Sequence, residues 1–285
     1  MTIALQTRRL AAIALVGAAA AFAGPAAAQD DSRIQELRDQ GFARIAIANE
    51  PPFTQVNPDG TVTGAAPDVA REIFKRMGID DVVASISEYG AMIPGLQAGR
   101  FDAVTAGLFM RPERCAAVAY SQPVLCDAEA FAVKAGNPLN LTTFADIAAH
   151  PTARIGAPGG GTEERLALEA GVPRDRVIVV PDGQSGINML QDGRIDVYSL
   201  PVLSISDLLA RAEDEDLAMV APVADAPVYC DGAAFRRQDT ALRDEYDRIL
   251  AEMKESGEFA AIIEPYGFSA AAAMSTSREK LCSGG

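Results

Sequence analysis

The stretch Ala106-Gly-Leu-Phe-Met-Arg-Pro-Glu-Arg-Cys115 follows a short apolar run and continues into a helix that Pro112 opens. Arg114 lies in the first turn of that helix. Its planar guanidinium offers paired N–H donors that suit a carboxylate, although a surface ion pair with Glu113 is the alternative use of this side chain. The stretch therefore predicts a strand–loop–helix unit with an anion-binding arginine beyond the carboxyl end of the strand.

Strand-like and helix-like segments alternate on both sides of this stretch, which is typical of parallel sheets covered by helices. Strands are expected at 43–48, 82–87, 103–106, 128–134, around Ile155, at 177–180 and at 232–235. Helices are expected at 66–77, 91–98, 163–170, 185–191, 202–211, 240–256 and 259–266. The residues after Gly267 are expected to form a surface tail.

Two α/β units joined by the segments 121–127 and 227–231 would form two lobes with a ligand-binding cleft between them. The expected division is 29–122 for the first part of lobe 1, 123–228 for lobe 2, 229–270 for the completion of lobe 1, and 271–285 for the tail. Bending at the two connecting segments would close the lobes over a ligand.

Residues 1–28 have the pattern of a signal peptide. Arg8 and Arg9 precede an apolar run at 10–22, and three alanines at 26–28 offer a small-residue cleavage site. The apolar run is too short to span a bilayer, so we expect an exported, periplasmic protein that is not embedded in the membrane. The net charge of the 285-residue chain is −14 at pH 7, which argues against nucleic acid and anionic membrane surfaces as partners.

The four cysteines of an exported chain are expected to form disulfides, the alternative being that each packs as a small apolar side chain. Cys126 and Cys230 lie in parallel contexts, Leu-Cys-Asp-Ala-Glu-Ala-Phe and Tyr-Cys-Asp-Gly-Ala-Ala-Phe. A bridge between them would pin the hinge, although four cysteines allow three pairings. Cysteine spacing and the single His150 give no metal-site pattern, so neither a metal nor a cofactor is expected.

A second anion-binding element is Gly159-Gly160-Gly161-Thr162, which opens an expected helix. Free backbone N–H groups and the Thr162 hydroxyl can meet an anion there, whereas a plain helix cap in a flexible turn is the alternative. We expect Arg114 from one lobe and Thr162 from the other to hold one carboxylate, with Gly107 and Gly161 as subsidiary contacts.

A site for a positive group is expected from Glu50, Phe53, Tyr89 and Phe109. The first three follow expected strand ends, where residues of α/β proteins face the ligand crevice. Ring faces attract diffuse cations, and a carboxylate can accept two N–H groups of an amidinium side by side. Taken alone, each ring is better explained as a core residue than as part of a pocket. Aromatic residues make up only 6% of the chain, and tryptophan is absent. The presence of three aromatic residues, Phe53, Tyr89 and Phe109, beside strand ends therefore favours a cation pocket.

Several segments together resemble a known family. They are Gly64-Ala-Ala-Pro-Asp68, Gly107 to Arg114, Gly193-Arg-Ile-Asp196 and Lys254-Glu-Ser-Gly257-Glu-Phe. Across nearly the whole mature chain, the order of segments resembles the extracytoplasmic solute-binding proteins of polar amino-acid ABC transporters. This resemblance implies a two-lobed α/β fold of the type II (Venus-flytrap) periplasmic binding proteins, with a hinge of two crossing strands. It further implies a monomer without enzymatic activity whose partner is a membrane permease.

A narrower set of segments is similar to the ectoine- and hydroxyectoine-binding members of that family: Ala48-Asn-Glu-Pro-Pro-Phe53, Ser87-Glu-Tyr-Gly90, Gly107-Leu-Phe109 and Ala157-Pro-Gly-Gly-Gly-Thr162. Members that bind free amino acids carry hydroxyl residues where this chain has Phe109 and Arg111, and an acid soon after the position of Asp196. Here no acid follows Asp196 until Asp207. The resemblance implies a zwitterion with a diffuse positive charge, imported as a compatible solute. The alternatives are a polar amino acid or betaine, or a periplasmic dehydratase-like enzyme in which Glu50 acts as a base.

Overall fold

The computed structural model describes residues 26–284, with side chains described from residue 32 onward. The expected signal peptide at 1–28 lies almost entirely outside the described residues. The first described element is α1 (Ala26–Gln40), a helix that the sequence analysis did not expect. Ile34 and Leu37 of α1 are buried in the core of the first lobe, where α1 packs against α9 (Thr240–Ser256).

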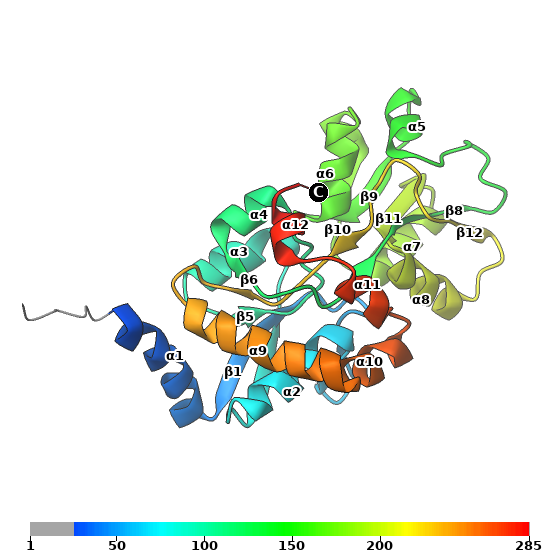
Figure 1. Ribbon diagram of the computed structural model, residues 1–285. Coiled ribbons are helices and arrows are strands. Elements are labelled where there is room, and N and C mark those ends of the chain that lie inside the picture. Colours follow the sequence, from blue (N-terminus) through cyan, green and yellow to red (C-terminus); the bar gives the residue numbers. More distant parts are fainter. Residues whose placement is uncertain (1–25, 285) are drawn as a thin grey trace, which may run out of the picture.

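The first lobe is built on a five-stranded sheet in the order β4-β1-β5-β14-β6 (Figure 1). Its strands are β1 (Phe42–Ile47), β4 (Asp81–Ile86), β5 (Ala103–Val104), β6 (Ala119–Tyr120) and β14 (Ala234–Phe235). β1 runs parallel to β4 and β5, while β14 runs antiparallel to both of its neighbours. Because β14 comes from late in the chain, this lobe is discontinuous.

The alternation of side chains along β1 divides the first lobe into two cores. Ala43, Ile45 and Ile47 belong to the cluster that α2 (Ala65–Arg76) and α9 cover. Ala46 instead belongs to the cluster that includes Met92 and Leu96 of α3 (Tyr89–Gln97), against which part of α4 (Pro112–Ala117) packs. The sheet is therefore covered by helices on both faces.

The second lobe repeats this plan with a sheet in the order β10-β9-β11-β8-β12. Its strands are β8 (Glu129–Lys134), β9 (Ile155–Pro158), β10 (Val177–Val180), β11 (Val197–Pro201) and β12 (Leu217–Val220). One core is formed with α7 (Gly183–Gln191) and α8 (Val202–Ala212), the other with α5 (Phe144–Ala149) and α6 (Thr162–Glu169). β8, which runs antiparallel to both of its neighbours, is the first strand of this sheet to follow the crossing from lobe 1.

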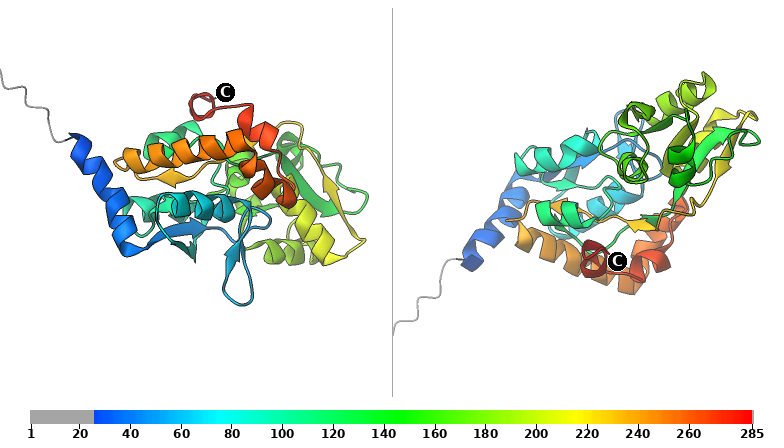
Figure 2. Two further views of the ribbon diagram at one scale, coloured as in Figure 1. Left: turned by 60° about the horizontal axis from the view of Figure 1, so that its bottom comes forward. Right: turned by 90° about the horizontal axis from the view of Figure 1, so that it is seen from above.

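The two lobes are joined by a pair of antiparallel strands, β7 (Cys126–Asp127) and β13 (Tyr229–Cys230). Cys126 and Cys230 lie directly opposite each other in this pair and form a disulfide. Figure 2 shows the lobes side by side, with α9 lying along the first. The expected type II two-lobed fold with two crossing strands is confirmed.

The remaining elements are short. They are the hairpin β2 (Gln55–Val56) and β3 (Val62–Thr63), the 3-10 helices η1 (Arg174–Arg176) and η2 (Glu264–Tyr266), and the helices α10 (Glu258–Ile263), α11 (Ala270–Met274) and α12 (Arg278–Cys282). Within residues 26–284, no helix has the length and apolar character needed to cross a membrane.

The expectation that residues 271–285 form a plain surface tail is wrong. Part of the segment folds into α11 and α12, and a disulfide between Cys282 and Cys115 ties α12 to α4. Arg278 strengthens this attachment, because its guanidinium donates to the carbonyl of Tyr120 and to the carboxylate of Asp247, each at 2.8 Å. The local composition of this segment predicted a tail. The contacts that anchor it could not be seen there, because they come from residues far away in the sequence.

The substitution Cys282→Ser should lower the free energy of unfolding, because the Cys115–Cys282 bond closes a span of 167 residues. Removing a long-range disulfide costs about 2–5 kcal/mol in typical cases. Guanidinium chloride unfolding of both proteins would measure the difference. Cys115→Ser is the matched control and should give the same loss, with no further loss in the double variant. Unchanged stability in both single variants would contradict the structural role of the bond.

Candidate functional site

One pocket between the lobes collects all of the ligand-binding residues that the sequence analysis expected. Its lining comprises Glu50, Phe53, Tyr89, Gly107, Phe109, Arg114, Gly161 and Thr162, together with Glu163 and Pro201. The free volume of this pocket is about 10 Å³, so its walls lie close together in this structure. Entry of a ligand therefore requires the two lobes to move apart.

Strand ends explain why these residues meet. Glu50 comes soon after β1, Tyr89 after β4, and Arg114 after β5, so the three lie beyond the carboxyl edge of the parallel strands of lobe 1. Thr162 follows β9 in lobe 2, and Pro201 ends β11. In α/β sheets the crevice outside the carboxyl ends of the strands is where ligands bind.

Glu50 connects the two lobes through its carboxylate. Ser204 of α8 donates its hydroxyl to Oε1 of Glu50 at 2.8 Å, and the Tyr89 hydroxyl lies 3.2 Å from Oε2. Burial raises the pKa of Glu50 to about 7, the nearby charge of Glu163 adds to the rise, and these two hydrogen bonds oppose it. A carboxylate this short of positive charge favours a cationic neighbour.

The aromatic residues serve both the core and the pocket. Phe53 and Phe109 meet edge to face with ring centroids 6.0 Å apart, and Phe53 also packs against Phe268 at 4.7 Å. Gly107 permits this packing, because it has φ +73° and an added Cβ would lie 2.9 Å from the Phe53 ring. Phe53 and Phe109 therefore pack against each other and also form one wall of the pocket.

The opposite end of the pocket carries unused hydrogen-bond donors. The guanidinium of Arg114 donates to the carbonyl of Phe109 in its own lobe and to the carbonyl of Gly160 in the other, both at 2.9 Å. Those two bonds use two of its five N–H groups. Thr162 is only 3% exposed, and its hydroxyl has no hydrogen-bond partner within the described part of the chain. Both groups are placed to receive an anionic ligand group.

The three glycines before Thr162 divide their roles. Gly160 has φ +73°, and a Cβ there would lie 2.5 Å from Cα of Gly90 in the other lobe. The N–H of Gly90 also donates to the carbonyl of Gly159 at 3.2 Å. Only Gly161 of the three lines the pocket. Part of the glycine run thus serves the close approach of the two lobes.

Sequence reasoning missed two acidic residues at the site. Having found no acid between Asp196 and Asp207, it treated Glu163 only as the start of a helix, but Glu163 lines the pocket. Glu129, the first residue of β8, lies behind it, and burial raises the pKa of both carboxyl groups. Asp207 pairs with Arg211 on α8 instead. The position of Glu163 beside Thr162 was a usable signal, whereas the approach of Glu129 depends on the packing of β8.

Ser204 was also missed as a contact of Glu50. No role was expected for it from the sequence, although it lies in the first turn of α8. A hydroxyl one turn into a helix that follows a cleft-facing strand end is a weak signal on its own. It gains meaning only when the lobes are brought together.

Comparisons with known proteins agree with this geometry. The model of the bacterial extracellular solute-binding proteins, family 3, matches residues 43–269. A probable amino-acid ABC transporter periplasmic-binding protein, y4tE, of Sinorhizobium fredii is 32% identical over 88% of this chain and 86% of its own length. The histidine-binding periplasmic protein of Salmonella typhimurium is 26% identical, over 78% and 87% respectively.

Among solved structures, the crystal structure of EhuB in complex with hydroxyectoine is 77% identical in sequence. It matches with a TM-score of 0.88 and covers 89% of this chain and 98% of that chain. The match of the family model to most of the chain, together with the shared two-lobed architecture, leads to one conclusion: the chain belongs to family 3 of the bacterial extracellular solute-binding proteins.

Proposed function

We propose that this protein captures ectoine or hydroxyectoine in the periplasm and delivers it to the membrane permease of an ABC transporter. The observation that carries the proposal is a pocket whose polar groups lack hydrogen-bond or charge partners at both ends. Arg114 and Thr162 have unused donors at one end, and Glu50, a buried carboxyl group with a raised pKa, lies toward the other. Ectoine is a cyclic amidinium carboxylate and would supply both missing charges. The similarity to EhuB, solved with hydroxyectoine, supports this choice.

At the anionic end, the ligand carboxylate would take N–H donors of Arg114 and the hydroxyl of Thr162. Arg114 belongs to lobe 1 and Thr162 to lobe 2. A carboxylate held by both would therefore favour the closed arrangement. Charge-assisted hydrogen bonds inside a small, dry pocket are among the stronger polar contacts in proteins.

At the cationic end, the amidinium would lie beside Glu50 and against the rings of Phe53, Tyr89 and Phe109. Each oxygen of Glu50 accepts one hydrogen bond in the structure, from Ser204 or Tyr89, and has a further lone pair available. Ring faces add about 0.5–2 kcal/mol for a diffuse cation. A compact ammonium would instead need three close acceptors; the rings offer none, so it would depend on the buried carboxyl groups of Glu50 and Glu163, whose pKa values are both raised.

Closure of the lobes is the proposed mechanism of delivery. Contacts that cross between the lobes are already present at Glu50 with Ser204, at Arg114 with Gly160, and at Gly90 with Gly159. A ligand that strengthens this set would shift the hinge toward the closed state, which the permease would recognise. We propose that the protein acts as a monomer after removal of residues 1–28.

We further propose that the protein binds its ligand without altering it. Glu50 has the raised pKa of a general base, but its two oxygens are already held by Ser204 and Tyr89. Such a carboxylate is positioned for recognition. Ectoine recovered intact by NMR after prolonged incubation is the expected result, whereas ring opening or dehydration in the presence of protein would favour the enzyme alternative.

Titration calorimetry with ectoine, hydroxyectoine, glycine betaine and histidine would test the proposal. We expect the two ectoines to bind most tightly and Arg114→Ala to weaken them by at least about 30-fold, because loss of a buried charge partner costs about 2–5 kcal/mol. Arg194→Ala, which changes an exposed arginine of lobe 2, is the control and should bind normally. Tighter binding of histidine than of ectoine, or unchanged affinity in the Arg114 variant, would reject the assignment.

Ectoine affinity should rise with pH through the pKa of Glu50. An amidinium favours the ionised carboxylate, and at pH 5 a group with a pKa of about 7 is mostly protonated. Between pH 8 and pH 5 the affinity should therefore fall by up to about 100-fold, with proton release on binding near pH 7. Calorimetry in buffers of different ionisation enthalpy measures that release. Glu50→Gln should bind weakly and lose this pH dependence, and a profile identical to that of the unchanged protein would count against Glu50.

Phe109→Ser restores the residue type common in relatives that bind free amino acids. It should weaken ectoine binding by about 3- to 30-fold, because one ring contact worth about 0.5–2 kcal/mol is lost. Histidine binding should not improve, since the change adds a hydroxyl and no acid. Phe109→Tyr is the matched control that keeps the ring. A gain of histidine binding from the serine variant alone would undercut the argument about the cationic group.

A further inference from the structure

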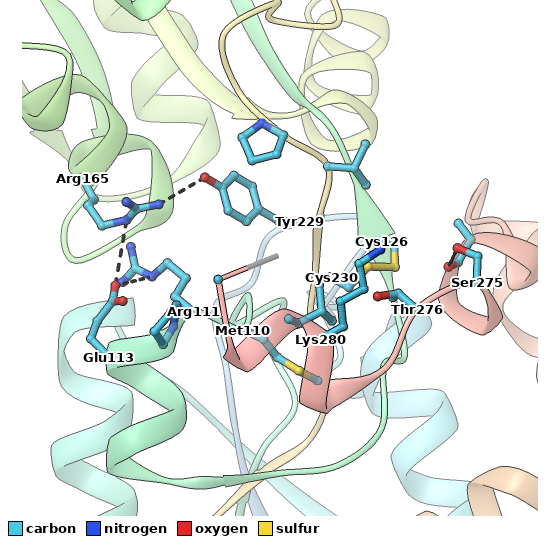
Figure 3. A pocket seen from close by; sticks show the side chains of 16 residues that line it. Met110, Arg111, Glu113, Cys126, Arg165, Tyr229, Cys230, Ser275, Thr276 and Lys280 are labelled. Atoms are coloured by element: carbon cyan, nitrogen blue, oxygen red, sulfur yellow. Dashed lines mark hydrogen bonds and ion pairs between the residues drawn. A yellow bond between two sulfur atoms is a disulfide. The ribbon is translucent and has the colours of Figure 1, made fainter.

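A second cavity lies beside the ligand pocket, on the hinge side of the cleft. It has a volume of about 640 Å³ and is formed by the loop leading into α4, by α6 of lobe 2, by β13 and by the C-terminal segment with α12 (Figure 3). It shares no lining residue with the ligand pocket. The loop residues Phe109 and Arg111 illustrate the separation, since Phe109 lines the ligand pocket and Arg111 lines this cavity.

The charged side chains of the cavity wall are mainly cationic. Among the described residues, Arg111, Arg165 and Lys280 line it together with one acid, Glu113. In Figure 3 both arginines gather around Glu113, while Lys280 comes from the C-terminal helix. In a chain whose net charge is −14, a cavity with this excess of positive groups selects for an anion.

Arg111 lacks the partners that a buried arginine normally has. It is 8% exposed, and its Nη1 has no hydrogen-bond acceptor within the described part of the chain. Its Nε faces Glu113 at 3.0 Å. Burial, followed by repulsion from Arg114, lowers the pKa of Arg111 to about 10. An oxyanion in the cavity would relieve both the missing acceptor and the repulsion between the two guanidiniums.

Apart from Ser275, Thr276 and Tyr229, the rest of the wall is apolar. Val228 is 59% exposed, and Pro227, Met110, Leu281 and the Cys126–Cys230 disulfide complete this surface. Tyr229 connects the two parts of the wall, since its hydroxyl accepts from Arg165 at 3.1 Å and its ring stacks on Phe109 at 5.7 Å. The surroundings fit a molecule with one anionic group and an apolar body.

We propose that this cavity is a second binding site, which takes a small organic oxyanion with an apolar body and holds it between Arg111, Arg165 and Lys280. Arg165 belongs to lobe 2, whereas Arg111 and Lys280 belong to lobe 1 and its C-terminal extension. An occupant would therefore contact both lobes. The proposal is independent of the identity of the ligand in the first pocket.

Benzoate and phenyl phosphate are suitable probes, with benzamide as the uncharged control, in ligand-observed NMR titrations at low ionic strength. The Arg114→Ala protein is used so that the probes cannot bind through the arginine of the first pocket. We expect both anions to bind and benzamide to bind at least ten-fold more weakly. Loss of anion binding in Arg114→Ala, or equal binding of benzamide, would overturn the proposal.

Arg111→Gln, added to Arg114→Ala, should weaken benzoate binding by at least ten-fold. Lys280→Gln on the same background should weaken it by a few-fold, and it provides a second test at an exposed position if the Arg111 variant does not fold. Arg194→Gln is the charge-matched control and should leave benzoate binding unchanged. Benzoate affinity that is unchanged by both the Arg111 and the Lys280 substitutions would disprove the site.

Discussion

The burial of Glu50 where the two lobes meet is the constraint on which the site depends. A carboxylate there is removed from water and lies near Glu163, so its pKa rises to about 7. Ser204 from lobe 2 and Tyr89 from lobe 1 each bond to it, but neither brings a positive charge. The pocket consequently favours an occupant that carries its own cation. In the proposed function, the donors of Arg114 and Thr162 would define the opposite end, and the two ends together would select a zwitterion.

The same closeness of the lobes explains features that look unrelated in the sequence. The glycine run 159–161 allows one backbone to approach another at Gly90, and the crossing strands keep the lobes in register through paired hydrogen bonds and the Cys126–Cys230 disulfide. Bending at β7 and β13, as proposed, would leave each lobe with its own cores. A protein that captures and releases its ligand requires rigid lobes whose contact with each other can open and close.

Most of the fold could be predicted from the sequence, because the alternation of apolar strands and amphipathic helices is a local signal. The helix expected at 240–256 and the strand expected at 177–180 have these same bounds in the structure. The first-pocket residues could be chosen because each follows a strand end. Glu129, Ser204 and the attachment of Cys282 to Cys115 could not, since their roles depend on contacts between segments that lie far apart in the chain.

The short stretch from Gly107 to Cys115 contributes to the core, to the ligand pocket and to the attachment of the C-terminal helix. Gly107 makes room for the Phe53 ring, Phe109 and Arg114 line the ligand pocket, and Cys115 holds the C-terminal helix. The resemblance to amino-acid binders implied a hydroxyl at the position of Arg111, and in the structure this side chain lines the neighbouring cavity instead of the pocket. In the two proposals, Arg111 would therefore leave the first pocket without a hydroxyl partner for a compact ammonium, and it would supply a guanidinium with a free donor to the second cavity.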